Sequence, residues 1–282
     1  MSKVAATSRQ IPKGWPKDRP LAVSVSVMLE GWTDDSAPGL GPMGNPLKAG
    51  VLDSQARSWA DYGPKTGAWH LLDAFEQCGI KAVFYVSGIL ADRYPELMKA
   101  IAAQGHAIGA HAWAQNILPA YQTREEEETD LKRTVAALER HSGQKPQGWI
   151  SPRATPSVNT PDLLARHGLH WYADAFDQDL PYLTQTPSGP VVAVPFTVEV
   201  NDVPLHIKHG NEPDAFVRVL DRILLGWKDF GKPACLDITA HAHVFGRPPG
   251  VMMMKEAIRR AQRADSAWLT THAELAALCL KA

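Results

Sequence analysis

Short apolar runs alternate with amphipathic stretches along most of this chain. A β-rich run at 21–28 is followed by apolar strands at 82–86 and 106–110, with a helical segment at about 91–103 between the latter two. Strands that alternate with helices at this spacing form βα units, so the pattern predicts a mainly parallel sheet. Residues 33–58 show no clear periodicity and predict a long loop. We expect further strands at 148–153, 171–173, 191–194, 196–200, 234–239 and 267–270, and helices at about 66–78, 123–142, 159–166, 214–228, 252–264 and 271–281.

Polar residues recur where the predicted strands end. In parallel α/β folds the carboxyl ends of the strands meet at one edge, and ligands bind there. Fewer than eight clean βα units are present, so we expect one α/β domain folded as an irregular, distorted (β/α) barrel. The polar positions at that edge are Glu30, His111, Arg153, Asp174, Asn201, Asp202, His241 and His243.

Length and charge limit the possible partners. The 282 residues are enough for one large domain, which we place at 21–282 behind a proline-containing arm at 1–20. With 29 basic and 30 acidic residues the chain has no basic excess, so we expect no nucleic-acid partner. Three scattered cysteines, the lack of an apolar leader and the lack of a membrane-length apolar window favour a cytoplasmic protein without a membrane partner. A homo-oligomer is expected, because the arm and residues 33–58 have no other obvious partner.

Several motifs resemble a known superfamily. Leu29-Glu30-Gly31, residues 82–88, residues 105–111, residues 148–153 and His241 are similar in order and type to the polysaccharide deacetylase (NodB-homology) superfamily. The resemblance implies a distorted (β/α) barrel that hydrolyses amide or ester bonds. Within the superfamily, the segments 62–63 with 67–69, 179–182, 199–202 and 241–248 resemble the branch of metal-independent allantoinases and cyclic imide hydrolases.

The chain departs from the superfamily at the positions that carry its chemistry. Metal-dependent deacetylases have two aspartates after the first strand, a general base and a metal ligand, and the matching residues here are Leu29 and Glu30. Their two metal-binding histidines four residues apart match His111 and Gln115, and the arginine that orients their base matches Ile150. Because Leu29 cannot accept a proton, the resemblance implies a changed mechanism.

A metal cofactor is not favoured by the remaining donors. A zinc or manganese ion needs three or more good ligands, usually histidine or carboxylate. Glu30 and His111 qualify, but Gln115 is a weak neutral ligand. The alternative is a divalent metal held by Glu30, His111 and Gln115, with Asp202 or His243 as further possible ligands.

Without a metal, Glu30 and His111 are the candidates to position and activate a water. His241 is the candidate general acid toward the leaving nitrogen, and we expect it, not His243, to face the cavity. A core histidine bonded to the backbone is the alternative interpretation of His111. Arg153 is expected to hold a carboxylate or imide oxygen or to stabilise the oxyanion. The expected substrate-binding residues are Trp32, Tyr62, Trp113, Gln115, Arg153 and Asp202.

This chemistry predicts a hydrolase that opens the ring of a small cyclic amide or imide with water. An activated or strained ring is easier to hydrolyse without a metal than a plain N-acetyl group. Two alternatives remain open: a metal-dependent deacetylase of an N-acetylated sugar or other amide, and a catalytically inactive homologue that binds a ligand.

Overall fold

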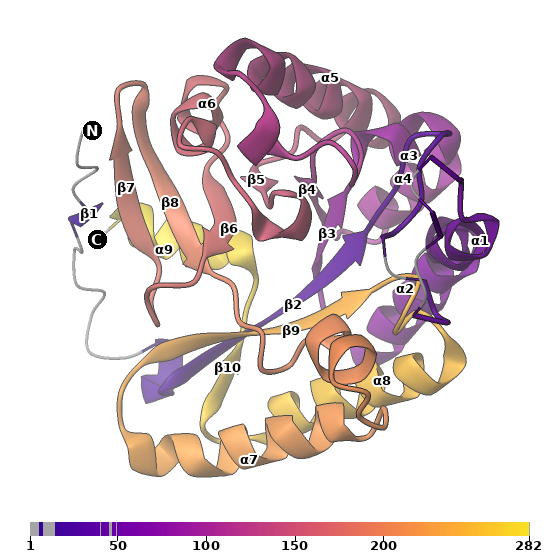
Figure 1. The fold of residues 1–282 in the computed structure, drawn as a ribbon. Helices are drawn as coiled ribbons and strands as arrows, with labels where there is room; N and C mark the ends of the chain where they lie inside the picture. Colours follow the sequence, from indigo (N-terminus) through magenta and orange to yellow (C-terminus); the bar gives the residue numbers. More distant parts are fainter. Residues whose placement is uncertain (1–5, 8–14, 40, 45–46, 49, 282) are drawn as a thin grey trace.

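Ten strands form one curled sheet in the part of the chain that the computed structural model describes, residues 6–7, 15–39, 41–44, 47–48 and 50–281 (Figure 1). The strands are β1 (Ala6–Thr7), β2 (Leu21–Leu29), β3 (Val83–Val86), β4 (Ala107–Ala110), β5 (Gly148–Trp149), β6 (Trp171–Ala175), β7 (Tyr182–Thr186), β8 (Gly189–Pro195), β9 (Ala234–His241) and β10 (Ala267–Leu269). The α-helices are α1 (Ser54–Tyr62), α2 (Ala68–Cys78), α3 (Gly88–Arg93), α4 (Pro95–Ala103), α5 (Arg124–Ser142), α6 (Thr160–Arg166), α7 (Ala215–Phe230), α8 (Pro248–Arg263) and α9 (His272–Lys281). Two π-helical turns, η2 (Gly63–Gly67) and η5 (Val203–Lys208), follow α1 and Asp202.

The strand order gives an incomplete barrel. Parallel pairs connect β9, β2, β3, β4, β5, β6 and β8, and β10 pairs with the start of β2. At the far edge, β7 runs antiparallel to β8 and to β1. The irregular segment after β8 lies along β9, where the Thr239 amide donates to the Val200 carbonyl at 2.9 Å. The predicted irregular (β/α) barrel is therefore confirmed.

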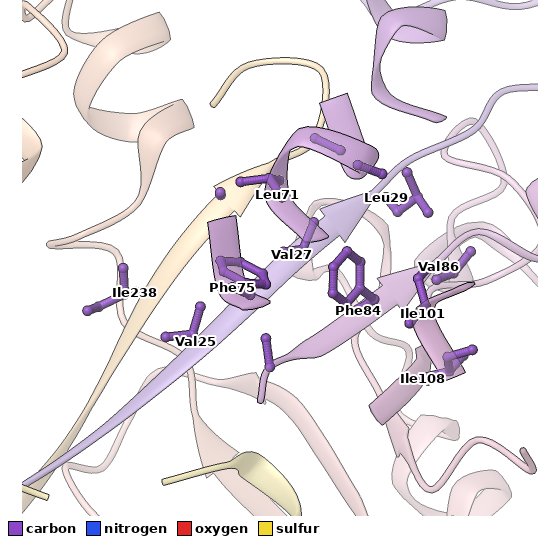
Figure 2. Close-up of a cluster of buried hydrophobic side chains, with 14 of the residues drawn as sticks. Val25, Val27, Leu29, Leu71, Phe75, Phe84, Val86, Ile101, Ile108 and Ile238 are labelled. Carbon is purple, nitrogen blue, oxygen red and sulfur yellow. The ribbon is translucent and has the colours of Figure 1, made fainter. Parts of the chain in front are cut away.

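The two faces of β2 separate the outer core from the barrel interior. Val25, Val27 and Leu29 face outward and pack with Leu71 and Phe75 of α2 (Figure 2). Successive side chains of a strand point to opposite faces, so the intervening residues 24, 26 and 28 point into the barrel. Residue 30 continues this inward series, and the strand therefore delivers its carboxylate to the carboxyl end of the barrel.

The opposite end of the barrel is closed by α9. Leu275 and Cys279 of this helix form a buried cluster with Trp15, Ala22 and Trp171. Ala22 lies near the start of β2, so this cluster lies at the amino ends of the strands.

A buried polar network lies between this floor and the upper part of the barrel. Asp237 of β9 accepts hydrogen bonds from Ser24 at 2.6 Å and from Ser26 of β2. It also accepts from the Thr239 hydroxyl at 2.7 Å and lies 3.0 Å from His272 Nε2, and His272 Nδ1 lies 2.7 Å from the Tyr85 hydroxyl. The network therefore links β2, β3, β9 and α9 inside the barrel.

Three local predictions differ from the structure. Helix α1 begins inside the predicted loop 33–58 and continues past its end, and the Asp53 carboxylate caps it by accepting from the amides of Gln55 and Ala56. The predicted helix 91–103 is divided into α3 and α4, because Tyr94 leaves the helical conformation before Pro95. The predicted strand 196–200 is irregular, and β7 and β8 form a hairpin instead.

The predicted arm at 1–20 lies partly outside the described residues, at 1–5 and 8–14. Its described parts contact the domain: β1 pairs with β7, and Trp15 is buried. The arm as a separate unit stays a prediction. No helix in the described part of the chain is long and apolar enough to cross a membrane.

Candidate active site

A cavity of about 160 Å³ lies at the carboxyl ends of the strands, as the sequence pattern predicts. It brings together Glu30 after β2, His111 after β4, Arg153 after β5 and His241 at the end of β9. The floor and walls are mostly apolar, with Met28, Ile150, Phe176 and Phe196 among the lining residues. We call this space the Glu30 cavity.

Glu30 is surrounded by histidines. Its carboxylate oxygens lie 3.7 Å from His111 Nε2 and 3.8 Å from His243 Nδ1. Burial favours the neutral acid, but the neighbouring His111 imidazole and the charges of His241 and His243 outweigh it and lower the pKa of Glu30 to about 2. Glu30 is therefore an anion over the whole range in which the protein can be assayed.

The orientation of His111 is fixed by the backbone. Its Nδ1 lies 2.7 Å from the Ile150 carbonyl, which can only accept a hydrogen bond, so Nδ1 carries the proton. In the neutral ring Nε2 then has the free lone pair, and in the charged ring the same atom carries the proton that is directed at Glu30 and lowers the pKa of that carboxyl. A water that contacts both Nε2 and the Glu30 carboxylate can give its proton to the imidazole.

Asp202 and His241 form a buried pair. The Asp202 carboxylate lies 2.6 Å from His241 Nδ1 and accepts from the amides of His241 at 2.7 Å and Phe245 at 3.2 Å. Burial works against the charged imidazole, but the attraction of Asp202 prevails and raises the pKa of His241. With Nδ1 engaged by Asp202, the proton at Nε2 is the one available to a ligand in the cavity.

His241 and His243 have different surroundings. His241 lines the Glu30 cavity, whereas His243 packs edge-on against Trp59, with ring centroids 4.5 Å apart, and more loosely against Trp32 at 6.1 Å. Burial lowers the pKa of His243 to about 4, despite the opposing effect of Glu30. His243 is thus a neutral neighbour of Glu30 at neutral pH.

Five of the six expected substrate-binding residues do not line the Glu30 cavity, and three of these have other partners. Trp113 lies beneath the Arg133 guanidinium, 4.5 Å from its ring centre, because the side chain packs toward α5. Tyr62 stacks with Arg247 at 4.1 Å and lines a second cavity of about 660 Å³. Gln115 is buried and donates to the Ser87 hydroxyl at 3.0 Å. The structure places these three residues outside the Glu30 cavity, and their contact with substrate stays a prediction.

The other two predicted contacts are placed differently. Asp202 is fully buried behind His241 and acts on a ligand only through that ring. Trp32 reaches the site through His243.

The donors at the superfamily's metal position do not form a metal site. The amide nitrogen of Gln115 is directed at Ser87 and at the His111 carbonyl, and the same Ser87 hydroxyl accepts from the Gly31 amide. Replacing a histidine by this glutamine leaves Glu30 and His111 as strong donors. Among the residues that the structure describes, no group of three or more histidine, cysteine or carboxylate side chains is arranged to hold a metal. We therefore derive no chemical step through a metal.

Sequence analysis missed several residues of the site. Lys208, between the predicted strand 196–200 and the predicted helix 214–228, lines the cavity because it ends the π-helical turn η5 that borders it. Trp59, which directly follows the predicted loop 33–58, packs on His243. Ser87 follows a strand in one of the motifs behind the resemblance, and that position was a usable signal.

Comparisons with known proteins agree with this geometry. The family model for polysaccharide deacetylase matches residues 59–172. A Schizosaccharomyces pombe (strain 972) protein provisionally assigned as a polysaccharide deacetylase is 24% identical over 300 residues, which cover 93% of this chain and 91% of that protein. A Pseudomonas aeruginosa PAO1 structure with the same provisional assignment has a TM-score of 0.85 at 26% identity, covering 95% of this chain and 93% of that one. The structure of PuuE allantoinase has a TM-score of 0.84 at 25% identity, with coverage of 94% and 91%.

These likenesses confirm the resemblance to the polysaccharide deacetylase superfamily and to the suggested branch within it. At the level of family they support a hydrolase that acts on carbon–nitrogen bonds other than peptide bonds.

Proposed function

We propose that this polysaccharide deacetylase-like protein hydrolyses a small cyclic amide or imide and opens its ring. The observation that carries the proposal is one small cavity lined by a proton acceptor, His111 beside Glu30, and a proton donor, His241 backed by Asp202. Ring opening of an amide needs both functions, because water must lose a proton and the leaving nitrogen must gain one.

Attack begins with a water held by Glu30 and His111. The water oxygen bonds to the carbonyl carbon while His111 Nε2 takes one of its protons. The Glu30 carboxylate accepts a hydrogen bond from the water's other proton and stabilises the imidazolium formed beside it. Its low pKa makes Glu30 a weak proton acceptor, and this leaves the base function to His111.

Ring opening follows when the carbon–nitrogen bond of the tetrahedral intermediate breaks. The electron pair of that bond passes to nitrogen, and His241 Nε2 supplies its proton. Asp202 keeps His241 charged and oriented until that moment, since its carboxylate holds Nδ1. The ring carbonyl becomes a carboxyl group, and the proton held by His111 returns His241 to its charged form through solvent.

The size of the cavity favours a small ring. Its volume of about 160 Å³ is below the roughly 300–1,000 Å³ of typical ligand pockets. The likeness to an allantoinase structure supports a compact heterocyclic substrate. A metal-dependent deacetylase is the second candidate, because the family model is that of polysaccharide deacetylases.

Chelation separates the two candidates. Protein purified with and without chelator is assayed on succinimide, hydantoin, allantoin and N-acetylglucosamine, and its metal content is measured by elemental analysis. We expect turnover of at least one ring compound that chelation does not change. Turnover of N-acetylglucosamine that disappears on chelation and returns with zinc or manganese would establish the deacetylase instead. Ligand binding without turnover of any of the four would favour an inactive homologue.

Cytoplasmic location and homo-oligomeric assembly stay predictions. Size-exclusion chromatography with light scattering tests the second, and a monomer would contradict it.

A further inference from the structure

We propose that the substrate carries a carboxylate or similar anionic group beside the ring that is opened, and that Arg153 and Lys208 bind it at the mouth of the Glu30 cavity. The proposal rests on the proposed function and names its substrate class. Both side chains line the cavity and both are exposed at its rim.

The charges of Arg153 and Lys208 have no protein partner in the described part of the chain. Neither side chain makes an ion pair or a hydrogen bond with any residue in the described part of the chain. Other arginines near the barrel are paired: Arg124 binds Asp162, and Arg133 binds Asp130. Two unpaired cations at the entrance of a cavity form a ready site for an anion.

The backbone that presents Arg153 has an uncommon conformation. Its φ of 55° and ψ of 18°, together with a φ of 49° at Ala154, place two successive non-glycine residues in the left-handed region. Such residues are uncommon, and this conformation persists only when its surroundings hold it. Here Ser151 anchors the turn, because its amide and hydroxyl bind the Asp174 carboxylate at 2.8 and 2.7 Å.

Lys208 is connected through η5 to Asp202 and His241, the pair that supplies the proton. Lys208 ends η5, the π-helical turn that starts directly after Asp202. The Asp202 carboxylate is bonded to His241, so η5 is tied to that pair at its first residue. The positive charge of Lys208 is near enough to His241 to lower the pKa of that imidazole, against the larger opposite effect of Asp202. π-Helical turns of this kind are frequent at functional sites.

The charges of the cavity also orient the ligand. Glu30 is an anion on the inner wall and repels a second anion placed beside it. Arg153 and Lys208 attract that group at the rim, where apolar Phe176 and Val198 border the same opening. The reacting carbonyl of the ring is thereby directed toward Glu30 and His111, with the carboxylate toward solvent.

The test compares hydantoin with hydantoin-5-acetic acid, the same ring with an added carboxymethyl group that carries one negative charge. We expect the wild-type protein to have the higher kcat/KM on the acid. The variants Arg153→Gln and Lys208→Gln should lose about 10–100-fold more kcat/KM on the acid than on hydantoin, mainly through KM. The preference for the acid should also fall as salt concentration rises. Lys228→Gln, which removes a similar exposed charge from the last turn of α7, is the matched control and should leave both activities unchanged.

Each other outcome has a defined meaning. Equal loss on both rings would place the two cations at the reacting oxygen and overturn the proposal, as would the absence of any preference for the acid. If neither of these rings nor succinimide or allantoin is hydrolysed, the proposed function fails, and calorimetry with succinate and succinamide still tests the anion site. Binding of succinate alone that Arg153→Gln abolishes would sustain the site, and no binding of succinate would overturn it.

Discussion

Replacing Asp202 by asparagine tests the assignment of the general acid most directly. Asparagine keeps the shape of the side chain and one oxygen for the amides of His241 and Phe245, but it removes the negative charge next to the His241 ring. Burial, which opposes the charged imidazole, then prevails. In Asp202→Asn we therefore expect a neutral His241, which is a poor proton donor.

The size of the effect follows from the pair's geometry. With Nδ1 and Oδ1 2.6 Å apart, the charge centres of the two groups lie roughly 4 Å from each other, and at an effective dielectric constant of about 20 they attract by ~4 kcal/mol. If most of this attraction stabilises the transition state, kcat/KM falls by about 10²–10³. The alkaline limb of the kcat/KM profile, which reports the acid of the free enzyme, should also move to lower pH.

The assay is a pH profile of ring opening for wild type, Asp202→Asn and a matched control. Asp237→Asn is that control, because Asp237 is also buried against a histidine, His272, but at the closed end of the barrel. It should lower the melting temperature without moving the alkaline limb. If Asp202→Asn folds normally and keeps both kcat/KM and the alkaline limb, His241 is not the acid and the proposed mechanism is refuted.

Three further predictions concern stability and the base side of the site. Because the pKa of His241 is raised, the Asp202–His241 pair contributes its full stability below the ordinary pKa of 6.5 and loses it as pH rises through the raised value. The difference in unfolding free energy between wild type and Asp202→Asn, measured with urea, should therefore be larger at about pH 6 than at about pH 9. Glu30→Gln should reduce kcat by about 10²–10⁴. Because the pKa of Glu30 falls from 4.5 in the unfolded chain to about 2 in the folded one, its stabilising effect is present above pH 4.5 and is lost as pH falls toward 2. A difference in unfolding free energy between wild type and Glu30→Gln that stays constant over this range would contradict the assignment. Leu29→Ala should cost about 2–5 kcal/mol in urea unfolding, and Leu29→Asp should cost more and restore no base, because this side chain faces the outer core; full stability of Leu29→Asp would show that the side chain faces the cavity instead.

The barrel and its main site residues could be predicted from the periodicity of apolar residues and from the positions of polar residues directly after apolar strands. Strand ends in a parallel sheet converge, so Glu30, His111 and His241 were found from where they follow apolar runs. Helix α1 was missed because its signal, an Asp53 cap, is local and lies in a stretch without apolar periodicity. The orientation of Trp113 depends on packing with α5, which only the tertiary structure shows.

The difference between His241 and His243 was predictable only in part. Residues two apart on an ideal strand share a face, but the chain leaves β9 at His241, so strand alternation no longer places His243. Both rings therefore approach Glu30, from different sides. No pattern of residue types along the chain shows this.

The buried Asp237 network has a consequence for the order in which the barrel is completed during folding. The carboxylate of Asp237 finds its only histidine partner among the described residues in His272, at the start of α9. Until α9 docks, this carboxylate lacks its histidine partner and the open end of the barrel faces water, although β2 and β9 are already joined by their own strand pairing and by the serines of β2. Docking of α9 is therefore the folding step that buries the network and closes the end of the barrel opposite the Glu30 cavity.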